Sequence, residues 1–383
     1  MIQERLKALR AEMEKRGITV YVVPTADFHE SEYVGDHFKA RKFITGFTGS
    51  AGTAVITLDE AGLWTDGRYF VQAENQLKDS TVTLYRMGEE GVPTVDEFVK
   101  DRLKEGGCLG FDGRVVNGTW GGKLEKIAAE KNVSMHVTED LIDLIWEDRP
   151  ALSKQPLFIL EEKYSGKSTA DKIADLRKAM KENGADVHIL TSLYDIAWLL
   201  NIRGNDIDYV PVVLSYLVLN ETECIWFLQE EVVDDKIRAY LEENHITTKP
   251  YDAIYDYVPE IPADAVVLMN RGTVNYRIVN SLDKAIKVVD KPNPTELMKA
   301  VKNKTEVDNT RAAHVKDGVA FTKFMYWLKT NIGKIPMTEI SASDYLEARR
   351  REQDNFIELS FNTICAYGAN AAMMHYAATP ESD

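Results

Sequence analysis

The feature that most constrains the fold of this chain is a helix-and-strand pattern that occurs twice. Residues 5–23 (RLKALRAEMEKRGITVYVV) align without a gap with residues 172–190 (KIADLRKAMKENGADVHIL). Leu9 matches Leu176, a spacing of 167 residues (176 − 9) that holds along the whole alignment. In each copy, apolar residues at helical spacing precede a glycine and then an apolar run. The period far exceeds that of solenoid repeats, so the pattern predicts two domains of similar architecture.

Short strand patterns alternate with helical patterns after the first unit, which is typical of an α/β sheet covered by helices. We expect strands at Ile18–Val23, Thr53–Leu58, Leu63–Thr65, Thr81–Met87 and Leu109–Asp112, and helices at Ile2–Gly17, Tyr69–Leu77, Thr94–Leu103 and Lys123–Lys131. Polar, proline-containing segments lie at residues 148–156 and 291–294. They predict domains at 1–155 and 156–293 and a third segment at 294–383.

The third segment predicts a long charged helix at Thr295–Leu328, a helix at Thr338–Arg351 and a strand at Leu359–Tyr367. Met373–Tyr376 is expected to begin a further strand. Candidate buried positions of the long helix are Leu297, Val301, Val307, Ala312, Val315, Val319, Phe321 and Phe324. A segment of about 75 residues with so long a helix offers a thin core, so we expect an incomplete third domain whose last strand exposes an unpaired edge.

Charge and cysteine content exclude several classes of protein. The chain has 61 Asp and Glu against 46 Lys and Arg, a net charge of −15, which argues against a general nucleic-acid binder. Cys108, Cys224 and Cys365 lie far apart without a CxxC motif, which indicates a reducing compartment. No segment approaches the roughly 18 apolar residues of a membrane span, and the charged N-terminus does not resemble a signal peptide. We therefore expect a cytoplasmic protein with no membrane or nucleic-acid partner.

Five segments carry groups suited to chemistry, and each also has a structural explanation. They are Asp27–Glu32, Gly46–Gly52, Trp64–Tyr69, Ile196–Ile207 and Asn370–Tyr376. The first sets a histidine among carboxylates, as in Zn²⁺ or Mn²⁺ sites, but also suits a polar loop after a strand. The second is glycine-rich but lacks the Lys-Ser or Lys-Thr of a P-loop, and predicts a tight turn. The fourth predicts a core helix and a polar turn.

Arg68 and His375 are the main candidates in the other two segments. A guanidinium at a strand-to-helix junction can hold a carboxylate or a peptide carbonyl, or can pair structurally with Asp66, and the sequence alone favours neither. A lone histidine beside a strand is more often structural than a ligand. The chain has no HExxH, no GxSxG and no cysteine placed as an obvious nucleophile.

Several multi-residue motifs, in one order along the chain, resemble the Xaa-Pro aminopeptidases (aminopeptidase P) of the long, three-domain type, in the M24 and creatinase-like family. The motifs are SEY at 31–33, RKFITGFTGSAGTAVIT at 41–57, LWTDGRYFVQA at 63–73, DIAWLLNIRGNDI at 195–207, RAAHVKDGVAFTKFMYWL at 311–328, TEISASD at 338–344 and ELSFNTICAYGANAAMMHY at 358–376. The resemblance implies an α/β protein with two similar creatinase-type N-terminal domains, each a mixed sheet flanked by helices. The partial start of a pita-bread metallopeptidase domain would follow them.

The resemblance also implies a hydrolase with two divalent metal ions, Mn²⁺ above all, which removes the N-terminal residue from peptides with proline in second position. It assigns to His375 the imidazole that steadies the tetrahedral intermediate or the peptide main chain, and to Arg68 the contact from the first domain to the substrate. It further implies a possible homodimer. The family's metal ligands lie beyond the His-Tyr motif, which here ends at Tyr376. We therefore assign no metal ligand, and expect a truncated chain that alone binds no dinuclear centre and is inactive.

Two other functions remain open at the level of the sequence. A creatinase-like hydrolase shares the architecture but acts on a C–N bond of a small guanidino compound. A non-catalytic binding module, such as a histone chaperone of this architecture, would suit the net charge of −15. The sequence contexts of Arg68 and His375 favour the peptidase.

Overall fold

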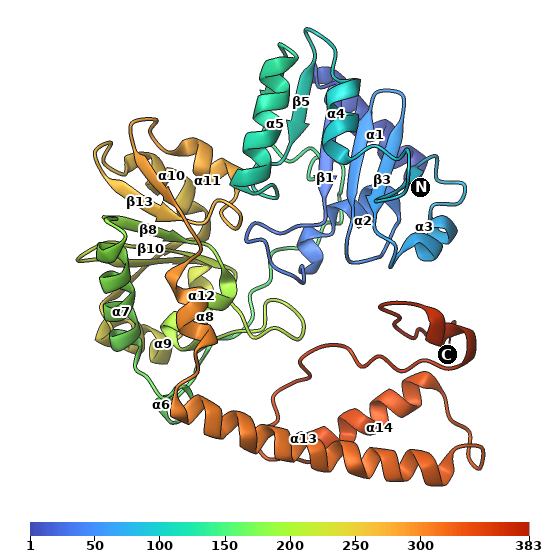
Figure 1. Ribbon diagram of the computed structural model, residues 1–383, viewed down its shortest axis with the longest axis vertical. Coiled ribbons are helices and arrows are strands. Elements are labelled where there is room, and N and C mark those ends of the chain that lie inside the picture. Colours follow the sequence, from blue (N-terminus) through green and yellow to red (C-terminus); the bar gives the residue numbers. More distant parts are fainter. Residues whose placement is uncertain (383) are drawn as a thin grey trace.

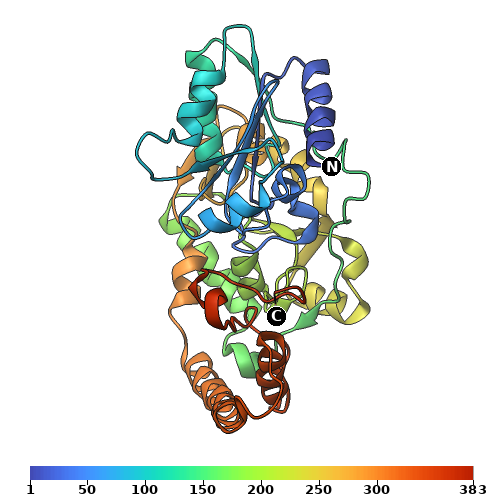
Figure 2. The ribbon, with the colours of Figure 1, turned by 90° about the vertical axis from the view of Figure 1, so that its right-hand side faces the viewer.

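The computed structural model describes residues 1–382, and its main features are two six-stranded sheets of one design (Figures 1 and 2). The first sheet contains β1 (Val20–Pro24), β2 (Thr53–Thr57), β3 (Ala61–Thr65), β4 (Thr83–Arg86), β5 (Cys108–Phe111) and β6 (Ser134–His136), in the order β4-β3-β2-β1-β5-β6. The second contains β8 (Val187–Leu190), β10 (Ser215–Leu219), β11 (Cys224–Leu228), β12 (Ile246–Pro250), β13 (Val266–Met269) and β14 (Lys287–Asp290), in the order β12-β11-β10-β8-β13-β14.

Corresponding strands of the two sheets also pair in the same sense. The central strand β1 is antiparallel to β2 and parallel to β5, and β8 is likewise antiparallel to β10 and parallel to β13. Each sheet is therefore mixed. The duplicated α/β architecture expected from the repeated helix-and-strand pattern is confirmed.

Helices cover both faces of each sheet. In the first half they are α1 (Ile2–Lys15), α2 (Ala40–Thr45), α3 (Phe70–Gln76), α4 (Val95–Arg102) and α5 (Gly118–Glu130). In the second half they are α7 (Thr169–Glu182), α8 (Leu193–Leu200), α9 (Asp235–Glu243), α10 (Ile254–Tyr257) and α11 (Tyr276–Ser281). Two short elements, β7 (Phe158–Ile159) and α6 (Glu162–Ser165), connect the halves, and β7 pairs with β9 (Ile202–Arg203).

The side chains of β1 point alternately into two hydrophobic cores, which explains why this strand is central. Val20 and Val22 enter one hydrophobic core, whereas Tyr21 and Val23 enter the other, which also holds Leu9 of α1. Successive side chains of a strand point to opposite faces, so a strand buried on both faces must be apolar at every position. Each such side chain contributes about 1.5–3 kcal/mol of burial free energy.

The two halves join through the N-termini of α5 and α11, which are paired in an antiparallel bridge between Asn117 and Asn275. These two residues are 158 positions apart (275 − 117). Each backbone hydrogen bond from one segment to the other has a counterpart in the opposite direction, between residues shifted by the same 158 positions. The bonds are Gly118 N to Val274 O (2.8 Å), Tyr276 N to Val116 O (2.7 Å), Thr119 N to Arg271 O (3.0 Å) and Arg277 N to Gly113 O (2.9 Å). The junction therefore follows a local pseudo-two-fold axis, as an isologous dimer interface does.

The last part of the chain contains α12 (Pro294–Ala300), α13 (Lys304–Asn331) and α14 (Glu339–Arg351). We expected one helix over Thr295–Leu328, and this is wrong. The helix is interrupted at 301–303, where the Asn303 side chain accepts a hydrogen bond from Glu306 N and caps α13. The helix expected at Thr338–Arg351 is confirmed, with Thr338 as its N-cap.

Most of the positions expected to be buried in this long helix are exposed. Phe324 is buried and Val307 is half-buried, whereas Leu297, Val301, Ala312, Val315, Val319 and Phe321 are exposed. The reason is that α13 extends away from both sheets, and α14 packs beside it (Figure 1). Trp327 of α13 stacks on Tyr345 of α14 with ring centroids 3.9 Å apart.

The strands expected at Leu359–Tyr367 and from Met373 are also wrong, because this segment is irregular apart from a 3₁₀ helix at Gly368–Ala372. A strand needs a hydrogen-bonding neighbour, and none lies beside this segment in the part of the chain that is described. The expected exposed strand edge therefore does not form.

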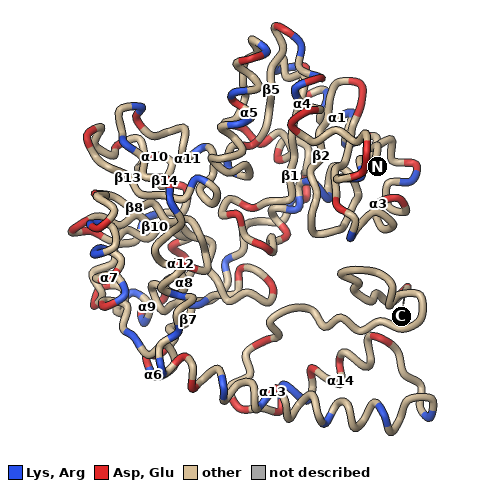
Figure 3. Tube along the Cα trace, in the orientation of Figure 1, with Lys and Arg blue, Asp and Glu red and all other residues tan. Residues whose placement is uncertain are grey.

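Charged residues of both signs are spread over the sheets and over α13 and α14, whereas the final segment contains few (Figure 3). Within residues 1–382, no helix combines the length and the apolar character that crossing a bilayer requires.

Candidate functional site

Arg68 and His375 are in contact, although 307 residues separate them in the sequence. Arg68 Nη1 lies 3.2 Å from His375 Nε2. A guanidinium can only donate, so Nε2 accepts this hydrogen bond and the imidazole proton resides on Nδ1. Both side chains are exposed, so the contact is open to solvent.

Asp66 fixes the direction of the Arg68 side chain. Arg68 lies in the turn between β3 and α3, and its Nε and Nη2 each donate to one Asp66 carboxylate oxygen at 2.8 Å. This hydrogen-bonded pair lowers the pKa of the Asp66 carboxyl and raises the pKa of the Arg68 guanidinium. The structural interpretation of Arg68, a pair with Asp66, is therefore supported, and the remaining nitrogen, Nη1, is directed to His375.

Tyr69 forms the floor beneath these two groups. Its side chain is only 2% exposed. The His375 ring stacks on it with centroids 5.7 Å apart and an interplanar angle of 22°, and the Arg68 guanidinium carbon lies 5.2 Å from the same centroid. The Tyr69 hydroxyl contacts Ser50 Oγ at 2.6 Å. Tyr69 thus links both predicted site residues to the segment Gly46–Gly52.

The segment Gly46–Gly52 encloses a guanidinium and does not form a phosphate cradle. Arg41, which is buried, donates to the carbonyl of Phe47 at 2.5 Å, to the carbonyl of Gly49 and to Thr25 Oγ1 at 2.9 Å. Its burial lowers the pKa of the guanidinium to about 10, so Arg41 stays charged near neutral pH. A phosphate cradle needs free backbone N–H groups, whereas those of Gly46, Phe47 and Thr48 already donate to acceptors within the protein. The structure therefore supports the interpretation of this segment as a turn into β2.

The segment that carries His375 is anchored to α14 through Glu339. The Glu339 carboxylate accepts hydrogen bonds from the Tyr376 hydroxyl (2.5 Å), the Tyr367 backbone N–H (2.5 Å) and the Asn370 side-chain amide (3.2 Å). Both Glu339 and Tyr376 are buried. His375 itself has a backbone φ of 50°, so its side chain projects from a left-handed turn between these anchors.

His29 has a structural role at the junction of the two halves. It is buried, its Nδ1 lies 3.1 Å from the Thr191 carbonyl, and its Nε2 lies 2.6 Å from the Tyr251 hydroxyl. Burial lowers the pKa of His29 to about 4, so the ring is neutral near pH 7. Asp27 Oδ1 accepts the backbone N–H groups of His29 and Ser31 at 2.9 Å, which closes a turn rather than capping a helix. The polar-loop interpretation of Asp27–Glu32 is thus supported.

The segment Ile196–Ile207 is structural, as expected. Its apolar part belongs to α8 and is buried. Arg203 donates to the carbonyl of Ala197, and Asp206 accepts the backbone N–H of Leu214 at 2.9 Å.

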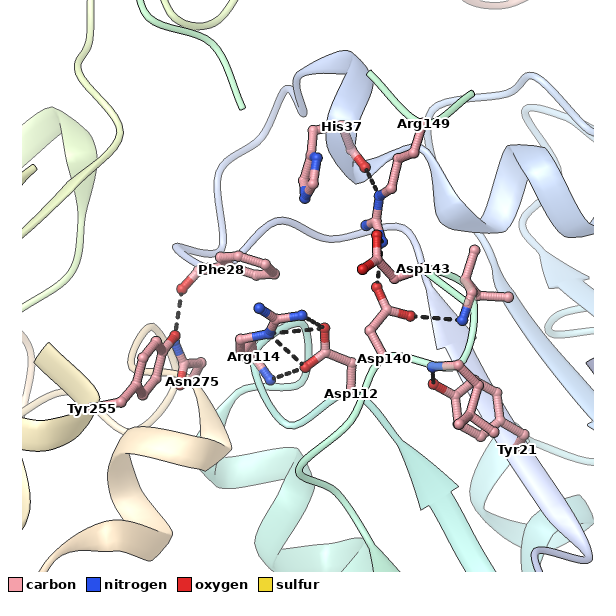
Figure 4. Close-up of polar contacts among 12 residues, drawn as sticks. Tyr21, Phe28, His37, Asp112, Arg114, Asp140, Asp143, Arg149, Tyr255 and Asn275 are labelled. Atoms are coloured by element: carbon pink, nitrogen blue, oxygen red, sulfur yellow. Dashed lines mark hydrogen bonds and ion pairs between the residues drawn. The ribbon is translucent and has the colours of Figure 1, made fainter. Parts of the chain in front are cut away.

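A second polar cluster, which the sequence did not indicate, lies at the end of β5 (Figure 4). Asp112 pairs with Arg114 at 3.0 Å, and Asp140 pairs with Arg149 at 2.6 Å. Burial is the main cause of a raised pKa at the Asp112 carboxyl, and the charge of Asp140 adds to it. The cavity between them has a volume of about 10 Å³, room for about one water molecule and too small for a peptide. The ion pairs, with the hydrogen bond from Arg149 Nε to the His37 carbonyl at 2.9 Å, give this cluster a structural role.

Sequence reasoning missed Tyr69, Ser50, Arg41 and Glu339 as members of the site. Tyr69 directly follows Arg68, and Ser50 lies in the glycine-rich segment for which the sequence predicts a tight turn. Glu339 gave no signal, because its role depends on a contact across 37 residues with Tyr376.

The described residues do not fit a dinuclear metal centre. Among residues 1–382, His, Cys, Asp and Glu side chains nowhere gather in a group of three or more that could hold a metal ion. His375 is accompanied by an arginine and a tyrosine, which are not ligands of Mn²⁺ or Zn²⁺ sites of this kind.

Comparison with known families defines the class of the protein. Residues 5–145 and 148–306 each match the creatinase/prolidase N-terminal domain, and residues 308–383 match metallopeptidase family M24. The chain therefore contains two creatinase/prolidase N-terminal domains, followed by a segment that matches the M24 metallopeptidase family.

Within that class the chain is similar to proteins named probable Xaa-Pro aminopeptidase P. The one from Sordaria macrospora is 39% identical over 97% of this chain and 63% of its own length, and the one from Neurospora crassa is 39% identical over 97% and 56%. The crystal structure of X-prolyl aminopeptidase from Caenorhabditis elegans, described as a cytosolic enzyme with a di-nuclear active site, superposes with a TM-score of 0.94 at 32% identity. The match covers 100% of this chain and 65% of the C. elegans chain. The chain thus spans less than two thirds of the length of these relatives.

Proposed function

We propose that the protein containing these residues is an Xaa-Pro aminopeptidase, which hydrolyses the bond between an N-terminal residue and a proline in second position. The observation that carries the proposal is the contact between Arg68 and His375. The family resemblance assigns these two residues to one substrate site. Although they are 307 residues apart in the sequence, Arg68 Nη1 lies 3.2 Å from His375 Nε2. The similarity to Xaa-Pro aminopeptidases along nearly the whole chain supports the same reaction.

The chemistry of the substrate suits these two side chains. An Xaa-Pro bond is a tertiary amide without an N–H, so a site recognises it through carbonyl oxygens and the free N-terminus. With Nε2 occupied by Arg68, His375 presents Nδ1–H as a donor, which can hold a substrate carbonyl or the oxyanion that develops from it. The Arg68 guanidinium, held by Asp66, adds a fixed positive charge beside that donor.

We further propose two divalent metal ions, Mn²⁺, as cofactors of the whole protein, with ligands outside residues 1–382. Its substrates would be proline-containing peptides in the cytoplasm, and the protein would form a homodimer. The domain limits we propose are 1–155, 156–293 and 294–383. The location draws support from the cytosolic C. elegans enzyme, and the metal ions from its di-nuclear active site.

The test is a cleavage assay of the gene product that contains this sequence, with Ala-Pro-Phe and Ala-Ala-Phe as paired substrates. We expect release of alanine from the first peptide at a rate at least tenfold higher, and loss of cleavage after metal chelation. The isolated 383-residue chain is expected to cleave neither peptide. A gene product that cleaves neither peptide, or that cleaves both equally, would contradict the proposal.

A further inference from the structure

Tyr69 contacts both Arg68 and His375, and its position suggests a role that the family resemblance does not assign. We propose that Tyr69 is a positioning residue that fixes the orientation of the His375 imidazole, and that Ser50 in turn fixes Tyr69. The segment Gly46–Gly52 then belongs to the functional site as its support. This inference rests on the proposed function for its catalytic meaning, although the contacts themselves do not depend on it.

Few contacts determine the orientation of the His375 ring. The residue is exposed, and its described side-chain partners are Arg68 at one nitrogen and the Tyr69 ring on one face. A hydrogen bond at Nε2 alone leaves the ring plane free to rotate about that bond. Stacking on a buried aromatic ring restricts this rotation, since the face of Tyr69 cannot move.

The Tyr69 ring is itself held in place by Ser50 and Phe47. Its hydroxyl lies 2.6 Å from Ser50 Oγ, and the Phe47 ring meets it edge-on with centroids 6.0 Å apart. Phe47 is completely buried, and its carbonyl accepts the hydrogen bond from Arg41. A Cβ at Gly49 would lie 2.2 Å from the Phe47 ring, so the segment has no free space in which to shift. The contacts from Arg41 to His375 are therefore continuous and well packed.

The consequence for chemistry is a defined donor direction. When the ring stacks on Tyr69 and Nε2 accepts from Arg68, Nδ1–H can point in only one direction. Removal of the Tyr69 ring leaves the donor present but not oriented. A catalytic group that is present and disoriented lowers turnover more than it lowers substrate affinity.

The first test uses the 383-residue chain and does not depend on activity. The chain has seven histidines, so ¹³C-histidine labelling gives seven imidazole Hε1 signals, and His375→Gln identifies the one of interest. We expect Tyr69→Leu to move the His375 signal downfield by more than any other histidine signal, because the ring current of Tyr69 is lost. Tyr326→Leu is the matched control, because Tyr326 is 74% exposed and remote from this contact.

Two milder variants keep the test decisive if Tyr69→Leu does not fold. Tyr69→Phe and Ser50→Ala remove only the hydroxyl contact, and each is expected to shift the His375 signal less than Tyr69→Leu would, but measurably. An unchanged His375 signal in a folded Tyr69→Leu, or in both milder variants, would overturn the proposal.

Kinetics of the gene product separate this inference from the proposed function. Tyr69→Phe should lower kcat for Ala-Pro-Phe by roughly threefold to tenfold with little change in KM. If the His375 signal shifts but the wild-type gene product cleaves no Xaa-Pro peptide, the proposed function fails and the positioning contact stands. If the wild type cleaves and Tyr69→Phe has wild-type kcat, the positioning role fails and the proposed function stands.

Discussion

At the scale of single residues, Gly49 shows how tightly the support of the site is packed. A Cβ at this position would lie 2.2 Å from the Phe47 ring, whereas a Cβ at Gly122 in α5 would meet nothing within 4 Å. We predict that Gly49→Ala lowers the free energy of unfolding by about 1–3 kcal/mol, the usual effect of overpacking. Gly122→Ala should raise it by about 0.5–1 kcal/mol, because alanine is the better helix former. Urea unfolding of both variants is the measurement, and equal effects would contradict the packing described.

His29 allows a prediction about pH at the same scale. Its pKa in the folded protein is about 4, against an unfolded value of 6.5, because burial disfavours the charged ring. Below pH 6.5 the unfolded chain takes up a proton that the folded chain does not bind until about pH 4, so this contribution to stability is lost as the pH falls. Between pH 7 and pH 5 the loss is about 2 kcal/mol.

Comparison with His29→Gln isolates this residue from other buried histidines such as His188, whose pKa burial also lowers. The variant is expected to lose about 2 kcal/mol less than the wild type between pH 7 and pH 5, as measured by urea unfolding at each pH. An identical loss in both proteins would show that His29 is protonated in the folded state as easily as in the unfolded one.

At the scale of elements, the N-cap Asn275 performs two tasks. Its side-chain oxygen accepts from Ile278 N at 3.1 Å, and its amide donates to the carbonyl of Phe28 in the other half of the chain at 3.1 Å (Figure 4). Asp234 caps α9 in the same way but only within its own half. We predict a loss of about 1 kcal/mol in the free energy of unfolding for Asp234→Ala and about 2 kcal/mol for Asn275→Ala. Equal losses would mean that the contacts of the Asn275 amide to Phe28 and to the Tyr255 hydroxyl contribute nothing.

The same scale shows which parts of the fold could be predicted from the sequence. The repeated helices and strands follow from local periodicity, since the apolar positions of α1 and β1 are the ones that the structure buries. Leu359–Tyr367 has a strand-like sequence, as the strands of the two sheets do, but no strand lies beside it among the described residues. Strand propensity alone does not form a sheet without a strand to pair with. The break at Asn303 depended on a side-chain cap, which competed with an otherwise continuous helical pattern.

Of the residues at the candidate site, only Arg68 and His375 could be predicted from the sequence. Arg68 and His375 were selected by motif, but the contacts of Tyr69 and Glu339 join residues far apart in sequence, and local patterns carry no information about such contacts. The pseudo-two-fold junction is a similar case. Its reciprocal hydrogen bonds connect segments 158 residues apart (275 − 117) that share only a Val-Asn pair, at Val116-Asn117 and Val274-Asn275.

At the scale of the whole molecule, the duplicated halves place the turn after β3 opposite the last segment of the chain. α13 extends along one side of the molecule, and the chain then returns past α14 toward the side on which α3 lies (Figure 1). There His375 contacts Arg68. The N-terminal half therefore contributes a side chain to a site whose other described member lies in the M24 segment. We propose that these two residues act together on one substrate.

A double-mutant cycle on kcat/KM for Ala-Pro-Phe, measured with the gene product, tests that claim most directly. We predict that Arg68→Ala and His375→Ala each lower kcat/KM by more than tenfold, with the fold retained. Residues that act as one unit are not additive, so the double variant should lose little more than the worse single variant. Losses that multiply, or wild-type kinetics in either single variant, would show that Arg68 and His375 do not form one functional site.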